Sequence, residues 1–196
     1  MFARLTLHSK KIRYMQKEFD KVRRTDRQNS DPSFLQDLLL HSMSCTIAVA
    51  TNDYPLIHAS FFAYDQGTDE IIFHFSRHGF GAQEMVHEKK VAISLYKFGK
   101  LYTATKAVDF GGEYQSVVIY GQLKLVEEET EKLQAMEFFF QKYFGHISKD
   151  AYTPTNLTEI RPIHVFKVKI DKWIGKEHRV PEKSLQSFDA GFKATM

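Results

Sequence analysis

The stretch from residue 71 to residue 85 holds the side chains best placed to bind a ligand. An alternating run, Ile71 to Ser76, leads into Arg77-His78, then a loop with Gly79 and Gly81, then a helix-forming segment. Free backbone N–H groups where a helix begins attract anions, and glycine lets a phosphate approach the backbone closely. A strand, a glycine loop and a helix are a common combination, so the pattern by itself leaves both a phosphate site and a plain connection open.

A second stretch, residues 113–121, reads Glu-Tyr-Gln-Ser-Val-Val-Ile-Tyr-Gly. Gly121 in a strand indicates close approach of a backbone or a ligand. Ser116 lacks the Gly-x-Ser-x-Gly surroundings of a nucleophilic serine. We therefore interpret Ser116 as a structural or hydrogen-bonding residue.

The histidines do not form a metal-binding pattern. His74 and His78 are four residues apart, but they straddle a strand end and a loop and would not share a helix face. His58 on a neighbouring strand could approach His74, yet no carboxylate accompanies them. Cys45 is the only cysteine, so neither an internal disulfide nor a multi-cysteine zinc site is possible. We predict no metal, and we interpret His74 as a polar group facing a ligand.

Acidic residues also form no general acid–base pair, because most fall on expected surface helices and turns. This favours chemistry carried by a cofactor that the protein positions. The chain has 17 Phe, 9 Tyr and 1 Trp, a large stock of flat apolar surface for a core, an interface or a planar ligand.

The elements that would hold these residues follow from the spacing of apolar residues. Asp31-Pro32 predicts the start of a helix over 32–42, and a second long helix follows the acidic run at 127–129 and ends at Gly145. A short helix is expected at 83–86, and strands at 45–51, 56–64, 70–76, 91–95, 101–108, 114–126 and 163–170, the last continuing over 173–179. Short connections favour an antiparallel sheet, which loses its exposed edges by closing. The predicted class is mainly β, a β-barrel with flanking helices.

Charge is concentrated at the N-terminus. Residues 1–30 hold nine Lys or Arg and three acids, whereas the whole chain is only +3. We predict a basic arm over 1–30, a barrel domain over 31–180 and a tail over 181–196. No nucleic-acid motif accompanies the charge, so a solvated arm, or one packed on a partner subunit, is favoured over nucleic-acid binding. The first 17 residues lack acids, a feature also typical of organelle transit peptides.

The compartment is predicted from two absences. No apolar run approaches the ~20 residues that cross a membrane, so we expect no membrane partner. A single cysteine fits the reducing cytoplasm, which is our predicted location.

Four motifs together resemble the pyridoxamine 5'-phosphate oxidase-like flavin split barrels, and their nitroimidazole-resistance (Nim) branch most. Arg24-Thr25-Asp26-Arg27 is similar to that branch's Arg-x-x-Asp-Arg opening, with one residue fewer between the charges. Phe73-His74-Phe75-Ser76 resembles its strand ending in Phe-His. Tyr114–Gly121 matches its Tyr-x-Ser-Val-x-x-x-Gly, and Ile174-Gly175-Lys176 is similar to its Thr-Gly-Lys. The resemblance spans about residues 22–178.

The resemblance implies a six-stranded antiparallel split barrel and a homodimer with FMN sites at the subunit interface. It also implies the positions of the flavin contacts, on the second and third strands, the loop after them and the Ser-Val strand. These are His58, Ala59, Ser60, Phe61, His74, Phe75, Ser76, Gly79, Gly81, Gln83 and Ser116, with His74 as the expected catalytic residue.

One departure concerns the phosphate. The family usually carries Gly-Arg-Lys or Ser-Arg-Lys after the third strand, but this chain reads Gly79-Phe80-Gly81. Two charge-assisted phosphate contacts are therefore replaced, with Arg77, His78 or Lys100 as possible substitutes. The Arg-Leu-His-x-Arg substrate motif of the vitamin B6 oxidase is absent as well, which argues against that enzyme.

The resemblance implies an FMN-dependent oxidoreductase that passes electrons from a nicotinamide nucleotide to a small planar substrate. Phe61, Phe80 and Trp173 are aromatic residues that could line the flavin ring. Two alternatives stay open. The barrel could be a non-enzymatic flavin- or haem-binding protein, with His74 or His58 as the axial ligand, or a nucleic-acid-associated module built on the basic arm.

Overall fold

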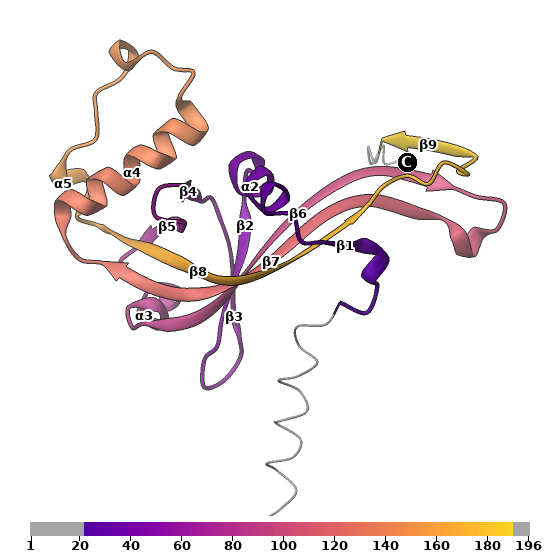
Figure 1. The fold of residues 1–196 in the computed structure, drawn as a ribbon. Helices are drawn as coiled ribbons and strands as arrows, with labels where there is room; N and C mark the ends of the chain where they lie inside the picture. Colours follow the sequence, from indigo (N-terminus) through magenta and orange to yellow (C-terminus); the bar gives the residue numbers. More distant parts are fainter. Residues whose placement is uncertain (1–21, 190–196) are drawn as a thin grey trace, which may run out of the picture.

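The computed structural model describes residues 22–189, and they form one antiparallel sheet with helices on it (Figure 1). The strands are β1 (Gln28–Asn29), β2 (Cys45–Val49), β3 (Leu56–Ser60), β4 (Ala63–Asp65), β5 (Glu70–Ser76), β6 (Lys89–Thr103), β7 (Gly111–Val126), β8 (Ile163–His178) and β9 (Gln186–Asp189). The helices are α2 (Pro32–His41), α3 (Phe80–Met85), α4 (Glu129–Phe144) and α5 (Leu157–Ile160), with short 3-10 turns η1 (Thr25–Arg27), η2 (Ala107–Asp109) and η3 (Lys149–Ala151). The strand order is β3-β2-β6-β7-β8-β5-β4, with β1 added to β8 and β9 to β6.

The sheet curls until its two ends approach each other. β3 and β5 are separated by four strands in the sheet order. Even so, the ring of His58 on β3 meets that of Phe75 on β5 edge-on, with centroids 4.3 Å apart. The enclosed side chains include Ile47, Ile93 and Phe73, all fully buried. The mainly β, split-barrel class predicted from the sequence is confirmed.

The two long helices begin where local chemistry predicts. Asp31 caps α2 by accepting the backbone N–H of Ser33 at 2.9 Å, and Pro32 takes the first helical position. Glu128 caps α4 in the same manner. Phe139 of α4 is buried, and its ring lies 5.0 Å from that of His74 on β5, so α4 covers the outside of that strand.

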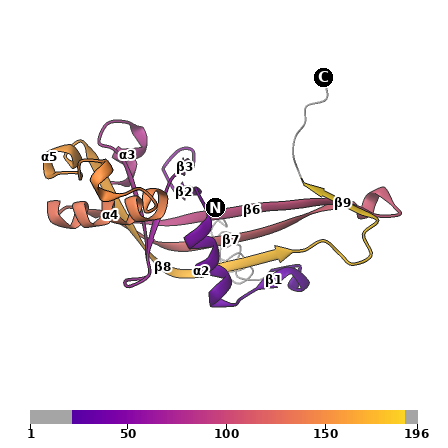
Figure 2. The same ribbon diagram turned by 90° about the horizontal axis from the view of Figure 1, so that it is seen from above.

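Three strands run far beyond the barrel. β6, β7 and β8 have 15, 16 and 16 residues, against five each in β2 and β3. Figure 2 shows their distal ends as a long ribbon with β9 along one edge, at the opposite end of the molecule from α4 and α5. We call residues 96–103, 111–115 and 177–178, together with β9, the β-extension.

The strand count differs from the expected six, because the sheet formed by residues 22–189 holds nine strands. One predicted strand, 56–64, divides into β3 and β4. Phe62 lies at the break, and its backbone N–H donates to Tyr143 Oη at 3.1 Å instead of to a strand. The break therefore follows from packing against α4, which the local sequence does not encode.

The predicted separate strand at 101–108 is wrong. Leu101 to Thr103 continue β6 after a register shift that accommodates Gly99 and Lys100, and η2 follows. Residues 28–29 and 186–189, expected in the basic arm and in the tail, pair with β8 and β6. Residues 1–21 of the predicted arm and residues 190–196 of the predicted tail lie outside the described residues.

Candidate functional site

The loop after β5 turns at a glycine whose backbone conformation other residues rarely adopt. Gly79 has φ +122°, a conformation that L side chains rarely adopt, and a Cβ there would meet nothing within 4 Å. The backbone N–H of His78 donates to Ser76 Oγ at 3.2 Å, which fixes the start of the loop. Gly81 is less restricted, because a Cβ at that position would make only ordinary contacts, the nearest at 3.9 Å from Leu56.

Several predicted site residues meet where the barrel closes, a region we call the closing rim. His58 packs on Phe75, whose ring lies 5.3 Å from Phe73 and 5.8 Å from Phe166. The approach of Gly81 to Leu56 places the start of α3 beside β3. The closing rim thus joins His58, Phe75 and the glycine loop, as a ligand contacting all three would require.

The side chains at the end of β3 have different surroundings. Ala59 is exposed, and Ser60 Oγ donates to the carbonyl of Phe61 at 2.7 Å. Phe61 is 63% exposed, and its ring lies 5.4 Å from that of Tyr143. Gln83 is exposed on α3, while Phe80 has a side chain that the structure does not describe.

His74 points away from the closing rim. Alternation along β5 places it on the face opposite Phe75, where it packs against Phe139 of α4. Its Nδ1 atom is buried and has no hydrogen-bond partner among the described residues. Burial lowers the pKa of His74 below its ordinary value, so the ring is neutral near pH 7.

Two cations, Arg77 and Lys132, bring positive charge to His164 on β8. Arg77 Nε donates to the carbonyl of Ile163 at 3.4 Å, and Nδ1 of the adjacent His164 is buried without a described partner. Burial, then Arg77 and Lys132, lower the pKa of His164. Lys132 on α4 is only 5% exposed. Lys100, by contrast, lies on the β-extension opposite Asp189.

Sequence reasoning named Arg77 but missed Lys132 and His164. No local signal singles them out, because one sits in a charged helix and the other in an alternating strand. Their approach depends on how α4 packs on the sheet.

Ser116 lies on a different surface. It is opposite Tyr96 on β6 and Lys176 on β8, on the outer face of the sheet. No hydrogen bond or ring contact joins Ser116 to the closing rim in the described part of the chain, so a single subunit does not unite all the predicted flavin contacts.

Two kinds of feature, a metal cluster and a membrane-spanning helix, are absent from the described residues. Among residues 22–189, no group of three or more His, Cys, Asp or Glu side chains could hold a metal ion. None of the described helices combines the length and the apolar character needed to span a bilayer.

Comparisons with known proteins identify the family. A model of the pyridoxamine 5'-phosphate oxidase family matches residues 31–177, and no curated protein matches. The flavocytochrome Anf3 from Azotobacter vinelandii superposes with a TM-score of 0.73 at 19% identity, covering 85% of this chain and 75% of that one. An FAD- and haem-binding protein from Mycobacterium smegmatis gives 0.71 at 16% identity, covering 79% and 74%.

A third solved structure connects to the branch suggested by the sequence motifs. It is a candidate 5-nitroimidazole antibiotic resistance protein from Bacteroides thetaiotaomicron, with a TM-score of 0.64 at 19% identity over 76% of this chain and 86% of that one. At such identities these structures share the fold, and the family assignment depends on the model that spans most of the chain. The chain therefore belongs to the pyridoxamine 5'-phosphate oxidase family.

Proposed function

We propose that this protein is an FMN-dependent oxidoreductase that works as a homodimer in the cytoplasm. The observation that carries the proposal is the division of the expected flavin contacts between two surfaces, the closing rim and the outer sheet face around Ser116. A ligand that needs both surfaces needs a second subunit.

The outer sheet face is suited to a second copy. One row across it reads Ile57, Ala48, Ala92 and Tyr120 on neighbouring strands. Ile57 is 67% exposed, and the small side chains beside it leave a flat surface. Flat apolar surfaces of this type are covered in stable dimers. In the proposed dimer, this face places Ser116 of one subunit near the closing rim of the other.

The residues present fit a flavin phosphate without the usual Arg-Lys pair. Gly79 leaves open space at the loop, and the unpaired Nδ1 of half-buried His164 can donate its proton to an anion. Arg77 and Lys132 add positive charge. We propose that the two cations and the neutral imidazole of His164 replace the missing contacts at Phe80-Gly81.

We assign the remaining side chains roles toward the flavin from their positions. His58 and Phe75 offer ring edges and faces to the flavin ring, and Ser116 offers a hydroxyl from the opposite subunit. His74 faces α4, so we assign it a positioning role behind Phe75 rather than direct catalysis. Bound FMN would supply hydride and single-electron transfer.

Anaerobic mixing of the FMN-loaded protein with NADH tests the activity. Loss of the oxidised flavin absorbance, followed by its return when a nitroaromatic compound is added, is the expected result. A flavin that stays oxidised would indicate that the protein is a non-enzymatic flavin carrier. A Soret band in the purified protein would instead assign a haem protein on the same barrel.

A further inference from the structure

The β-extension carries a cluster of aromatic rings that the barrel core does not use. Phe98, Tyr114 and His178 are cross-strand neighbours on β6, β7 and β8. The Tyr114 ring lies 6.1 Å from both Tyr96 and His178, nearly parallel to the former at 16°. Tyr102 completes the cluster, with its Oη 2.7 Å from His178 Nε2. We call these five residues the extension cluster.

The cluster presents open ring surface. Tyr96 is 57% exposed and Phe98 47% exposed, with ring centroids 6.3 Å apart. Tyr102 is buried, and its hydroxyl contacts the His178 ring. Exposed, pre-ordered aromatic rings offer stacking surface to a planar heteroaromatic group.

Arg27 brings a cation to the same place. Its Nη1 donates to Tyr114 Oη at 3.4 Å, and its guanidinium carbon lies 5.9 Å from the centre of that ring. Arg27 Nε is buried and has no acceptor among the described residues. Buried N–H groups are nearly always paired, so this donor points to an acceptor supplied from outside the chain.

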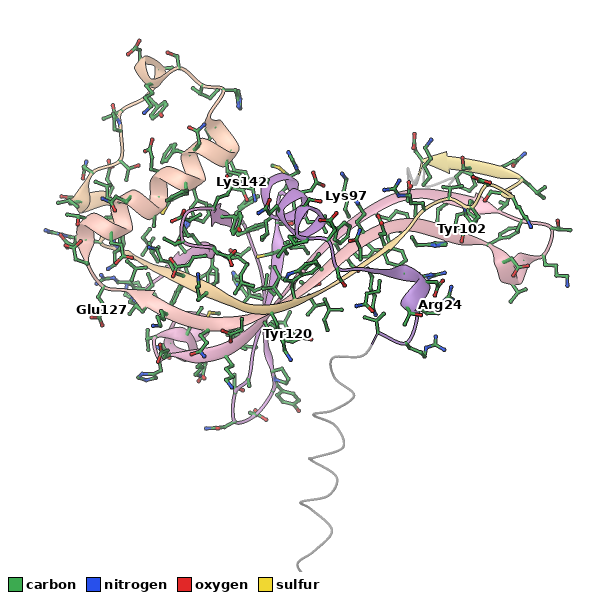
Figure 3. All side chains as sticks on the ribbon, viewed as in Figure 1. Arg24, Lys97, Tyr102, Tyr120, Glu127 and Lys142 are labelled. Atoms are coloured by element: carbon green, nitrogen blue, oxygen red, sulfur yellow. The ribbon has the colours of Figure 1, made fainter. Side chains whose placement is uncertain are left out.

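Arg24 differs from Arg27 because its charge is paired within the chain. Arg24 donates to both carboxylate oxygens of Asp26, at 2.8 and 2.6 Å, so its charge is neutralised within the chain. Figure 3 shows Arg24 beside the β-extension that carries Tyr102. No described carboxylate lies within ion-pair distance of Arg27, so its charge remains available for an anion.

The cluster also adjoins the proposed flavin site. Tyr96 is the direct cross-strand neighbour of Ser116. A ligand that begins at Ser116 and extends along β6 and β7 would therefore reach Tyr114 and Arg27.

We propose that Arg27 and the extension cluster bind the adenosine phosphate half of a dinucleotide, with the base stacked on Tyr96 and Phe98 and a phosphate accepting from Arg27. A flavin dinucleotide and a nicotinamide dinucleotide share this chemistry. The link to a dinucleotide depends on the proposed flavin function, because the other half of the ligand would lie at Ser116. Binding of a single adenosine phosphate does not depend on that function.

Calorimetric titration of the full-length protein with ADP tests the site directly. Arg27→Gln removes the free donor and should weaken ADP binding about tenfold, the effect of losing a charge-assisted contact. Tyr96→Ser removes stacking surface and should weaken it by roughly tenfold as well. Arg23→Gln and Tyr54→Ser are matched controls, since both residues are exposed and lie outside the cluster.

The outcomes separate this inference from the proposed function. No ADP binding by the wild type, or equal weakening by the control variants, overturns the adenosine phosphate site. ADP binding that survives in a protein unable to bind FMN supports the site while removing the flavin proposal. Displacement of ADP by FAD assigns the site to a flavin dinucleotide, and displacement by NADH alone assigns it to a nicotinamide dinucleotide. Failure of both to displace bound ADP overturns the dinucleotide assignment.

Discussion

At the scale of single residues, the site depends on imidazoles held in different surroundings. His58 lies at the closing rim on Phe75, whereas His74, only one residue from Phe75, is enclosed by α4. Strand alternation could be read from the sequence and correctly placed His74 and Phe75 on opposite faces. Which face would meet α4 could not be read, because that depends on contacts between distant segments.

The buried His74 should make stability depend on pH. Its folded pKa lies below the ordinary 6.5 because of burial, so the unfolded chain binds a proton that the folded chain excludes. Stability should therefore fall as pH drops from about 6.5 toward the folded pKa. Urea unfolding of His74→Phe across this range should give a smaller decrease than that of the wild type. His87→Asn, at an exposed histidine, should follow the wild type, and a decrease unchanged in His74→Phe would refute the explanation.

Lys142 should titrate far below an ordinary lysine. Its Nζ lies 3.4 Å from the centre of the Phe62 ring and donates to the carbonyl of Leu39 at 3.0 Å, between α4 and α2 (Figure 3). Burial lowers its pKa from 10.5 to about 8. NMR titration of reductively ¹³C-methylated protein should show one dimethyl-lysine signal with a midpoint near pH 8. Absence of this signal from the Lys142→Arg variant would assign the signal to Lys142. Titration midpoints above pH 10 for all lysines would contradict the described burial.

At the scale of elements, boundaries set by local chemistry were predictable and those set by pairing were not. The Asp31-Pro32 start of α2 follows from a side-chain cap and a fixed φ angle, both local. The buried face of α4 depends on contacts between distant segments. Its buried residues are Lys132, Ala135 and Phe139, and the ring of Phe140 stacks on that of Tyr152 from the loop over 146–156.

The β7–β8 pair depends on Gly121. The sequence predicted close approach at this residue, and the structure shows that the approaching group is the backbone carbonyl of Lys169, next to a register shift. Gly121→Ala should therefore lower the free energy of unfolding by about 1–3 kcal/mol, because backbone cannot move aside cheaply. Chemical denaturation measures this difference.

Gly81→Ala is the matched control for that substitution. A Cβ at Gly81 would make only ordinary contacts, so the stability change should stay within about 0.5 kcal/mol. Equal losses at both glycines would show that the close approach at Gly121 is not the cause.

At the scale of the whole molecule, the sequence predicted a closed barrel but not its strand order or the β-extension. Alternation identifies strands, while the sheet order β3-β2-β6-β7-β8-β5-β4 results from long-range pairing. The family resemblance, carried by motifs such as Phe73–Ser76, predicted a split barrel, which alternation alone could not identify. The approach of Lys132 to His164 emerges only from the assembled structure.

A charge placed on the outer sheet face should separate the proposed dimer. Ile57 is 67% exposed in one subunit, and in the dimer it would be covered. Ile57→Glu would bury an unpaired carboxylate, which costs several kcal/mol. Sedimentation should give about twice 22.8 kDa for the wild type and about 22.8 kDa for the variant. Met43→Glu, another exposed apolar residue off this face, should stay dimeric, and a monomeric wild type would contradict the arrangement.

Flavin binding tests the central claim most directly. Titration of FMN fluorescence with the purified full-length protein should give saturable quenching with one flavin per chain, since each dimer would contain two equivalent sites. Unchanged FMN fluorescence at protein concentrations far above that of the flavin would contradict the account. The closing rim would then be a barrel seam without a cofactor.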